Sequence, residues 1–346
     1  MSVATAEAAA PGVGIVVIGR NEGDRLERCL RSVAGRAEAI VYVDSASSDG
    51  SVACARRQGV DVVELDSHQP FTAARARNEG VRALLASHPQ IEWLQFIDGD
   101  CELDAGWIGA ALETLRVAPD VAVVFGRRRE RHPRASVYNC LCDLEWNTPV
   151  GEAASCGGDS MMRRSVFEAT GGFDPVLIAG EEPELCARIR RRGGRILRLD
   201  HDMTLHDAAM QHFRQWWLRS ERAGHAYAEG AAIDGWGRRE RNARAVASAL
   251  VWGLALPGAV GAALVALVGG ATLAGLMALL LLLAVAAVQL RRVLAEAGQR
   301  TSVRADALRY ALFTLLAKMP QAFGVVSYLW HRVRGARRRV IEYDRA

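Results

Sequence analysis

The chain has 346 residues, half of them hydrophobic, and a formal net charge of +4 at pH 7. This length is sufficient for one large domain or two with a substantial core. Arginine-rich clusters carry much of the positive charge, but no aromatic residues alternate with them as in a nucleic-acid platform, so we expect no nucleic-acid partner. These clusters lie at 127–134, 188–195, 238–244 and 332–339.

The cysteines and the first residues of the chain indicate its compartment. There are seven cysteines, an odd number, and no Cys-x-x-Cys pair, which is typical of a reducing compartment. Residues 1–12 have neither a basic start nor a long apolar run. They therefore predict no signal peptide, and we expect a disordered lead-in.

Short apolar runs alternate with amphipathic stretches between Val13 and about Leu199. The apolar runs predict strands over 14–18, 39–43, 60–65, 91–97, 121–125 and 195–199. Helices are predicted from about 26 to 33, and over 72–86, 105–117 and 183–192. This alternation predicts an α/β fold, a mainly parallel twisted sheet flanked by helices, in which ligands bind beyond the carboxyl ends of the strands.

Two carboxylates one residue apart, Asp98 and Asp100, follow the fourth of these strands. Like charges at the mouth of a buried strand repel each other, and a divalent cation is the usual partner for oxygen ligands. Mg²⁺ or Mn²⁺ would leave coordination positions for a diphosphate, which indicates an enzyme that handles an activated nucleotide. The alternative is a strand that ends in a polar turn.

Polar residues follow other predicted strands, and in a parallel sheet they should meet Asp98 at one edge. Arg77, in the helix predicted over 72–86, could neutralise phosphate or lie on a solvated face. Candidates for contact with a base or a ribose, or for plain polar turns, are Arg20, Asn21, Glu22 and Asp44.

The second half of the predicted sheet region supplies further candidates. Gly158 and Asp159 lie in a backbone that a ligand can approach closely. Glu181 and Glu182 precede a predicted helix whose N-terminus favours their ionised form, so either could take a proton from a hydroxyl nucleophile. His206 is a candidate metal ligand or phosphate contact, although a lone histidine is more often neither.

The composition changes after Arg244. Residues 245–268 and 271–290 are nearly free of charge, each is close to the length that spans a bilayer, and only Gly269-Gly270 separates them. They predict a transmembrane hairpin; the alternative is a pair of buried helices in a soluble bundle. Arginines flank both ends, and the charge rule makes their side cytoplasmic: Arg238, Arg239, Arg241, Arg244, Arg291 and Arg292.

A third apolar segment, 305–330, is interrupted by charged residues and a proline. A third span would put the basic tail outside the cytoplasm, so we predict an interfacial amphipathic helix or helical pair. A tryptophan pair with arginine beside the hairpin suits an amphipathic acceptor or, alternatively, plain interfacial anchoring: Trp216, Trp217 and Arg219.

Taken in order, these sites resemble those of family 2 glycosyltransferases with the GT-A fold, of the membrane-associated bacterial type. The resemblance covers roughly Val13 to Gly230. Ser45 and Ala46 depart from the family's usual acidic residue and glycine. The residues that carry the resemblance are 18–22, 43–44 through 49–51, 76–80, 98–100, 162–164, 171–174, 180–185 and 205–206.

The resemblance implies an inverting, metal-dependent transfer of a sugar from a nucleotide-sugar donor. It implies that Asp44 holds the base and that Asp98 and Asp100 bind the ribose and the metal-diphosphate. Glu182 stands where the family usually has an aspartate base. The implied organisation is a GT-A domain over 13–235, divided into a nucleotide-binding half (13–126) and an acceptor half (127–235), then two transmembrane helices (245–290) and an interfacial helix with a basic tail (305–346).

We therefore expect a hexosyltransferase-type enzyme at the bacterial inner membrane, with its catalytic domain in the cytoplasm, that acts in cell-envelope or exopolysaccharide synthesis. Its donor would be a UDP-sugar, with a GDP- or dTDP-sugar as alternatives, and its acceptor a lipid-linked or other glycan. Two other hypotheses stay open. One is a polyprenyl-phosphate sugar synthase, whose acceptor phosphate barely needs a base, and the other is a non-catalytic, membrane-anchored nucleotide-sugar binding protein.

Overall fold

The computed structural model describes residues 9–233 and 241–335. Most of the predicted lead-in, the flanking Arg238 and Arg239, and the tail from residue 336 lie outside the described residues. The chain forms two compact units, which we call the sheet unit (Met1–His132 with Trp146–Ala209) and the helical unit (Pro133–Glu145 with Met210–Ala346).

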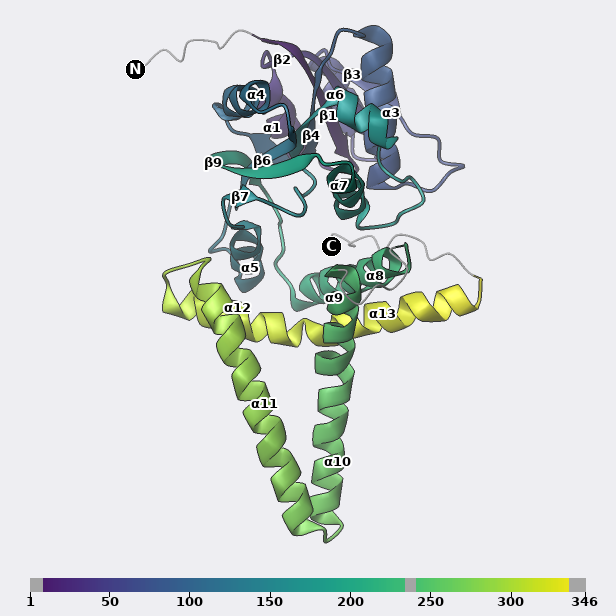
Figure 1. Cartoon of the computed structure of the whole chain (residues 1–346). Coiled ribbons are helices and arrows are strands. Elements are labelled where there is room, and N and C mark those ends of the chain that lie inside the picture. Colours follow the sequence, from purple (N-terminus) through teal and green to yellow (C-terminus); the bar gives the residue numbers. More distant parts are fainter. Residues whose placement is uncertain (1–8, 234–240, 336–346) are drawn as a thin grey trace. The chain divides into compact units, whose positions relative to one another are not determined.

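The sheet unit contains a nine-stranded sheet in the order β3-β2-β1-β4-β8-β6-β9-β5, with β7 paired to β9 (Figure 1). Strands β3, β2, β1 and β4 are parallel, and β6 is parallel to β9, whereas β5, β7 and β8 run in the opposite direction. The predicted mainly parallel α/β sheet is thus confirmed, and it is mixed. The strands are β1 (Ala10–Gly19), β2 (Ala37–Asp44), β3 (Asp61–Glu64), β4 (Trp93–Asp98), β5 (Cys101–Leu103), β6 (Val121–Glu130), β7 (Gly151–Glu152), β8 (Ser160–Arg163) and β9 (Arg195–His206).

Helices cover both faces of this sheet (Figure 1). The face that carries Phe96 packs against α3 and α6, and the face that carries Gln95 packs against α4, whose Trp107 Nε1 donates a hydrogen bond to Gln95 Oε1 at 2.7 Å. The helices of this unit are α1 (Asp24–Val33), α2 (Ser51–Arg57), α3 (Ala73–Ser87), α4 (Trp107–Val117), α6 (Arg164–Thr170) and α7 (Glu181–Arg191).

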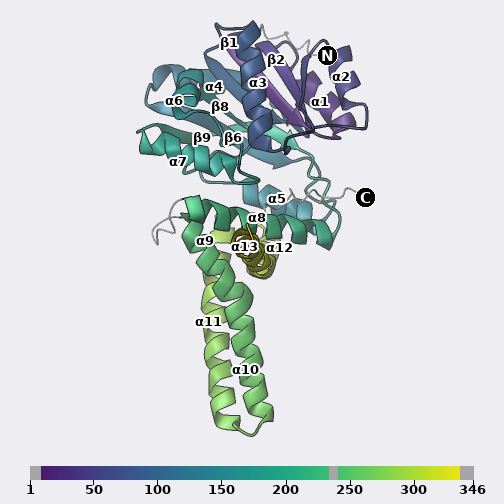
Figure 2. The same ribbon diagram turned by 90° about the vertical axis from the view of Figure 1, so that its right-hand side faces the viewer.

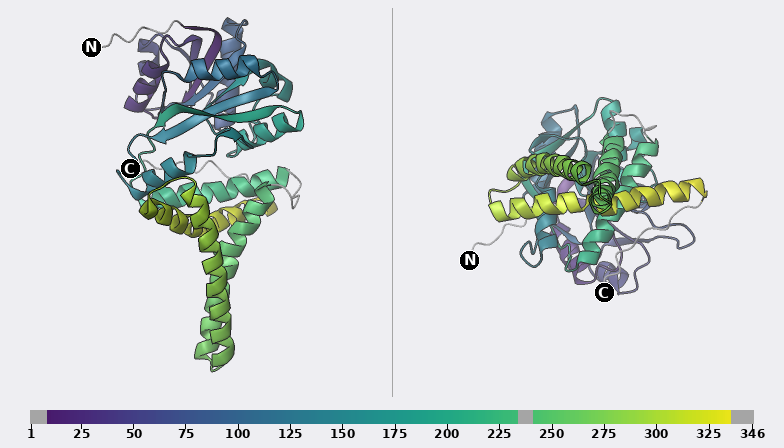
Figure 3. Two further views of the ribbon diagram at one scale, coloured as in Figure 1. Left: turned by 60° about the vertical axis from the view of Figure 1, so that its left-hand side comes forward. Right: turned by 90° about the horizontal axis from the view of Figure 1, so that it is seen from below.

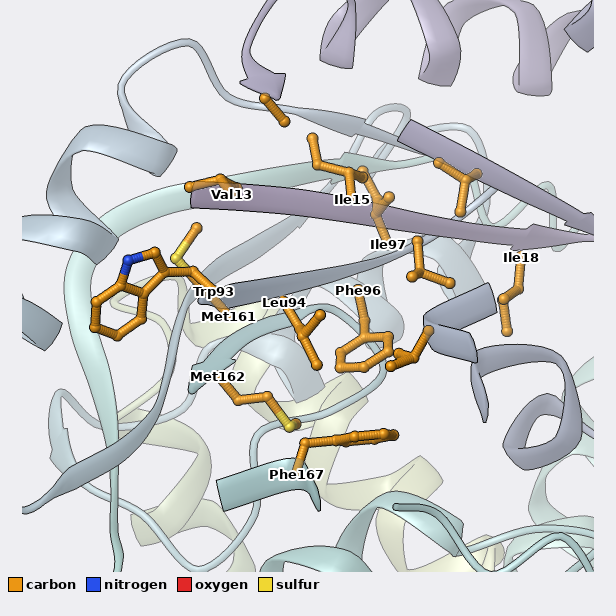
Figure 4. Packing of buried hydrophobic residues seen from close by; sticks show 14 of the residues in the cluster. Val13, Ile15, Ile18, Trp93, Leu94, Phe96, Ile97, Met161, Met162 and Phe167 are labelled. Atoms are coloured by element: carbon orange, nitrogen blue, oxygen red, sulfur yellow. The ribbon is translucent and has the colours of Figure 1, made fainter. Parts of the chain in front are cut away.

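The core lies between these layers because successive residues of the central strands are buried on both faces of the sheet. Figure 4 shows Val13, Ile15 and Leu94 within it. Phe96 meets Phe167 and Phe173 with ring centroids 5.7 and 5.4 Å away. Burial on both sides makes the central strands rigid, which fixes the positions of the side chains at their ends.

The register of the parallel strands brings their carboxyl ends to one level. Ile18 pairs with Asp98 and Gly19 pairs with Asp44. The polar residues that follow β1, β2 and β4 therefore share one edge of the sheet, as the alternation of elements predicts.

The helical unit contains the predicted hairpin (Figure 2). Its first arm runs through α9, η1 and α10, and its second arm is α11, with Gly269 and Gly270 between them. Three described segments are long and apolar enough to cross a membrane, at 242–268, 272–298 and 304–333. The helices are α5 (Val137–Trp146), α8 (Phe213–Ile233), α9 (Arg241–Leu250), the π-helix η1 (Val251–Ala255), α10 (Leu256–Val268), α11 (Thr272–Gly298), α12 (Arg304–Leu316) and α13 (Lys318–Val333).

The third apolar segment is a helical pair, α12 and α13, that runs crosswise to the hairpin (Figure 3). Helix α13 packs closely on α8, because a Cβ on Gly224 would overlap the backbone of Gln321 and a Cβ on Gly324 would overlap the backbone of Glu221. Helices α5 and α8, which the sequence analysis assigns to the 13–235 domain, pack within this unit. Whether α12 and α13 lie on a membrane stays a prediction.

Candidate active site

Asp98, the last residue of β4, is bound by two arginines. Its Oδ1 accepts a hydrogen bond from Arg77 at 2.8 Å, and its Oδ2 lies 3.3 Å from Arg128. Arg77 is buried on α3 and also pairs with Glu181 at 2.8 Å. The guanidinium of Arg77 is therefore held by two carboxylates at the sheet edge.

Asp100 faces His206 instead. Strand β5 pairs Cys101 with His206 of β9, and this register brings the imidazole beside Asp100, with His206 Nε2 3.4 Å from Asp100 Oδ2. Asp100, Cys101 and His206 offer ligand atoms that all lie within 4.8 Å of one another. The predicted metal residues Asp100 and His206 thus come together, whereas the Asp98 carboxylate turns toward the arginines.

His206 lies between two carboxylates, since its Nδ1 is 3.7 Å from Glu130 Oε2. Burial disfavours the imidazolium, but Asp100 and Glu130 outweigh burial and raise the pKa of His206 to about 9. Burial also opposes ionisation of Asp100, but His206, Arg128 and Arg25 hold the pKa of Asp100 well below its usual range. The ring of Trp146 lies edge-on to His206, with centroids 4.6 Å apart.

The residues at this place fit a hard divalent cation. A carboxylate and an imidazole within coordination reach are ligands that Mn²⁺ accepts, and the buried Nδ1 of His206 faces a carboxylate, as is usual for a metal-bound histidine. Glu22 adds a third acidic group. Its burial, with the charge of Asp100, raises the pKa of Glu22 to about 8, whereas a cation beside it would favour its ionised form.

Among the candidates for base and ribose contact, Asp44 is buried and bonded inside the protein, whereas Asn21 and Arg20 lie just after the end of β1. Asp44 is only 1% exposed, and its oxygens accept hydrogen bonds from Tyr42 Oη at 2.8 Å and from Ser47 N at 2.7 Å. Asn21 has a φ of 54° and accepts a hydrogen bond from Ser48 N, so it ties the loop after β1 to the loop after β2. The guanidinium of Arg20 lies over the Phe71 ring at 5.5 Å.

Gly158 and Asp159 lie directly beside Asp98. Asp159 is fully buried; it accepts hydrogen bonds from the Asp98 N–H at 2.9 Å and the Thr204 hydroxyl at 2.8 Å, and pairs with Arg128 at 2.8 Å. A Cβ on Gly158 would lie 2.8 Å from Asp98 Oδ2 and 2.9 Å from Arg77. Asp159 thus orients Asp98, and only a glycine leaves room at position 158.

The two glutamates at the start of α7 diverge. Glu181 faces Arg77, while Glu182 is 8% exposed and its Oε1 accepts hydrogen bonds from Cys156 N and Cys186 Sγ. Helix α7 begins at Glu181, two residues before the predicted start, so both glutamates lie in its first turn. Burial raises the pKa of Glu182, although the two hydrogen bonds lower it.

The predicted membrane-proximal residues belong to the helical unit. Trp216 is buried against Phe313, Trp217 packs on Phe323 at 6.0 Å, and Arg219 pairs with Glu145 at 2.6 Å. These contacts give all three a packing role inside their own unit.

Sequence reasoning missed Arg128, Glu130 and Trp146. Arg128 and Glu130 extend β6 beyond its predicted end at residue 125, so the rule that applies to Asp98, a polar residue after an apolar strand, also points to them. Trp146 ends α5, a helix that the apolar pattern did not reveal. No local signal links it to His206.

Part of this chain matches a known family. Residues 14–171 match the family model for glycosyl transferase family 2, which confirms the resemblance seen in the sequence. The TPR repeat-containing protein Synpcc7942_0270 of Synechococcus elongatus is 31% identical over 96 residues, which are 28% of this chain and 22% of that protein. The match therefore spans less than a quarter of that relative.

Two solved structures resemble this chain to different degrees. The mannosyltransferase PcManGT from Pyrobaculum calidifontis, in complex with GDP-Man and Mn²⁺, matches with a TM-score of 0.57 and 19% identity over 95% of this chain and 91% of that one. Glucosyl-3-phosphoglycerate synthase from Mycobacterium tuberculosis, in complex with Mn²⁺, UDP and its product, gives a TM-score of 0.44 and 18% identity over 64% and 78% of the two chains. The first likeness confirms the GT-A fold.

Proposed function

We propose that this chain, a family 2 glycosyltransferase over residues 14–171 with the GT-A fold, moves a hexosyl group from a nucleotide-sugar donor to a hydroxyl with inversion at the anomeric carbon. The observation that carries the proposal is the pairing of Asp100 with His206 beside an Asp98 that two arginines hold. A carboxylate, an imidazole and two guanidinium groups form a suitable setting for a metal-diphosphate.

Mg²⁺ or Mn²⁺ would be held by Asp100 and His206, and the mannosyltransferase of similar fold is a complex with Mn²⁺. When bound, the cation would stabilise the charge of the leaving nucleoside diphosphate. Asp98 would contact the ribose or diphosphate, and its ion pairs with Arg77 and Arg128 would hold its carboxylate in place. The donor would be a UDP-, GDP- or dTDP-sugar.

Glu182 is the proposed general base. Burial raises its pKa, which makes the carboxylate a stronger base, and its position at the N-terminus of α7 favours the ionised form. Glu181 would act on the donor side through its contact with Arg77. Asp44, Arg20, Asn21 and Glu22 would line the nucleotide end; Asp44 would then have to exchange an internal hydrogen bond for one to the base.

The helical unit supports a membrane location and a lipid-linked or membrane-proximal acceptor. Its hairpin carries Arg244 near the start of the first arm and Arg291 and Arg292 late in the second, which the charge rule assigns to the cytoplasmic side of a bacterial inner membrane. Helices α12 and α13 expose apolar side chains that suit the interface: Leu308, Leu312, Leu316, Phe323, Val326 and Trp330. A role in cell-envelope or exopolysaccharide synthesis would follow.

The low exposure of Glu182 favours a second candidate, a polyprenyl-phosphate sugar synthase. A phosphate acceptor is already ionised, so it needs no base. Full transfer by Glu182→Gln would support this candidate, and loss of transfer with intact donor binding would support the hydroxyl acceptor.

One experiment tests the proposal. The purified full chain is incubated with a panel of nucleotide sugars and Mn²⁺, and release of nucleoside diphosphate is measured with and without membrane lipids. We expect release with one donor, and its loss on addition of EDTA. Binding of a nucleotide sugar with no release under any condition would instead indicate a non-catalytic binding protein.

A further inference from the structure

A pair of buried thiols surrounds the carboxylate of Glu182. Glu182 Oε1 accepts a hydrogen bond from the backbone N–H of Cys156 at 2.5 Å and another from the Cys186 thiol at 2.9 Å. The sulfur atoms of Cys156 and Cys186 lie 3.6 Å apart, and neither cysteine is more than 4% exposed. The carboxylate of Glu182 is therefore buried and bound by two hydrogen-bond donors.

The two thiols come from different parts of the chain. Cys186 lies one turn after Glu182 on α7, where residues four apart face each other. Cys156 lies in the loop between β7 and β8, and its own sulfur is 3.5 Å from the carbonyl oxygen of Gly157. The Cys186 thiol donates to Oε1 of Glu182, and the Cys156 thiol also interacts with this carboxylate.

A thiol is ordinarily a weak donor, but here it stays protonated. The contact with Cys156 and then burial raise the pKa of Cys186 well above its usual range. For Cys156 the contact with Cys186 lowers the pKa, but burial and the charge of Glu182 outweigh it, so the pKa of Cys156 is raised as well. A hydrogen bond to an ionised acceptor is stronger than one between neutral groups. The Cys186 S–H is therefore a persistent donor to Glu182.

We infer that Cys186 is a positioning residue, which holds Oε1 of Glu182 and leaves Oε2 to receive the proton of the acceptor hydroxyl. This inference rests on the proposed function, since it takes Glu182 as the base. The surroundings of Glu182 have opposite effects on its pKa. Burial and the charge of Glu181 raise the pKa, while the Cys186 and Cys156 donors lower it. Loss of the thiol donor should therefore raise its basicity and loosen its orientation.

The test is the pH dependence of kcat/KM for the full chain, compared with Cys186→Ala and Cys186→Ser. We expect Cys186→Ala to shift the acid limb of the profile upward by about one pH unit, because the ionised carboxylate loses a donor. Cys186→Ser restores an O–H donor and should return the limb to its original position or below. Cys54→Ala, which changes a partly exposed thiol on α2, is the matched control and should leave the profile unchanged. An equal loss of activity at every pH in both Cys186 variants would indicate a packing role and overturn the inference.

A second measurement does not depend on turnover. The S–H stretching band of Cys186, identified by its absence in Cys186→Ala, should lie at the low frequency of a thiol bound to a carboxylate and should rise in Glu182→Gln. An unchanged band in Glu182→Gln would overturn the inference. If Glu182→Gln retains full transfer while its band shifts, the proposed base is wrong although the contact exists. If Glu182→Gln is inactive and the acid limb of Cys186→Ala stays in place, only the positioning role is wrong.

Discussion

His206 Nε2 lies 3.4 Å from Asp100 Oδ2, although 106 positions separate the two residues in the chain. The antiparallel pairing of β5 with β9 sets this distance, because it places His206 directly opposite Cys101. The candidate metal site therefore depends on the register between β5 and β9. Substitutions of its side chains leave this backbone pairing in place, so the site can be tested separately from the core.

Substitution of Asp100 by alanine should remove the carboxylate ligand and leave the fold intact. We expect nucleoside diphosphate release to fall by about two orders of magnitude or more, with weaker Mn²⁺ binding measured by electron paramagnetic resonance. Asp200→Ala, at a 91% exposed carboxylate on β9, is the matched control and should change neither quantity. Unaltered turnover in Asp100→Ala would refute the metal assignment.

Glu130 should set the orientation of His206 for the metal. Glu130→Gln keeps the shape and one acceptor oxygen but loses the charge that faces Nδ1. We expect Mn²⁺ affinity to fall by about 10- to 100-fold. Tm should also fall, because the buried Glu130 oxygens accept hydrogen bonds from the backbone N–H groups of His132 and Ala208, and the glutamine can accept only one of them. Titration of Mn²⁺ into both proteins measures the difference, and equal affinities would exclude this role.

The pKa of about 9 for His206 predicts how the metal-free protein responds to pH. Because the pKa is raised from its ordinary value of 6.5, the imidazolium contributes stability that is fully present below pH 6.5 and is lost as the pH rises through about 9. In EDTA, Tm should therefore decline across this range more in the original chain than in His206→Gln. Parallel curves for the two proteins would contradict the raised pKa.

Arg77 is a buried cation between two carboxylates. Arg77→Met leaves Asp98 and Glu181 without their partner, and we expect a loss of about 3–5 kcal/mol in the free energy of unfolding. Arg82→Met is the control on the same helix, since Arg82 is exposed and pairs only with Glu79 among the contacts described. Denaturant unfolding of the two variants should separate them clearly; similar losses would count against a buried ionic role.

Gly158 should tolerate no side chain. Gly158→Ala places a methyl group against Asp98 and Arg77, so we expect about 1–3 kcal/mol of destabilisation together with weaker donor binding. Gly109→Ala, on the helix α4, meets open space and should be neutral or stabilising. Thermal unfolding and nucleotide titration of both variants check this, and normal binding in Gly158→Ala would show that the site is looser than described.

Regular patterns predicted the strands that end at Gly19, Asp44 and Asp98, because apolar runs bounded by polar residues are local signals. Strand β8 escaped prediction because its four residues include no β-branched or aromatic side chain, whereas the equally short β3 contains two valines. The same holds for the candidate site: local motifs were predicted, and contacts between distant segments were not. Asp100 and His206 were recognisable as motif residues, whereas the two arginines on Asp98 and the thiols on Glu182 depend on contacts between distant segments that no window of sequence contains.

The glycine contacts of the helical unit have a mechanical consequence. At Gly224 and Gly324 the backbones of α8 and α13 touch, and Gly253 of η1 meets the backbone of Lys318 in the same manner. Small residues that bring backbones together restrict rotation of a helix about its own axis. Helix α13 is therefore fixed by close backbone contact with both α8 and η1, so its apolar side chains keep one orientation relative to the hairpin. The depth at which this unit would lie in a bilayer would then be set by these backbone contacts.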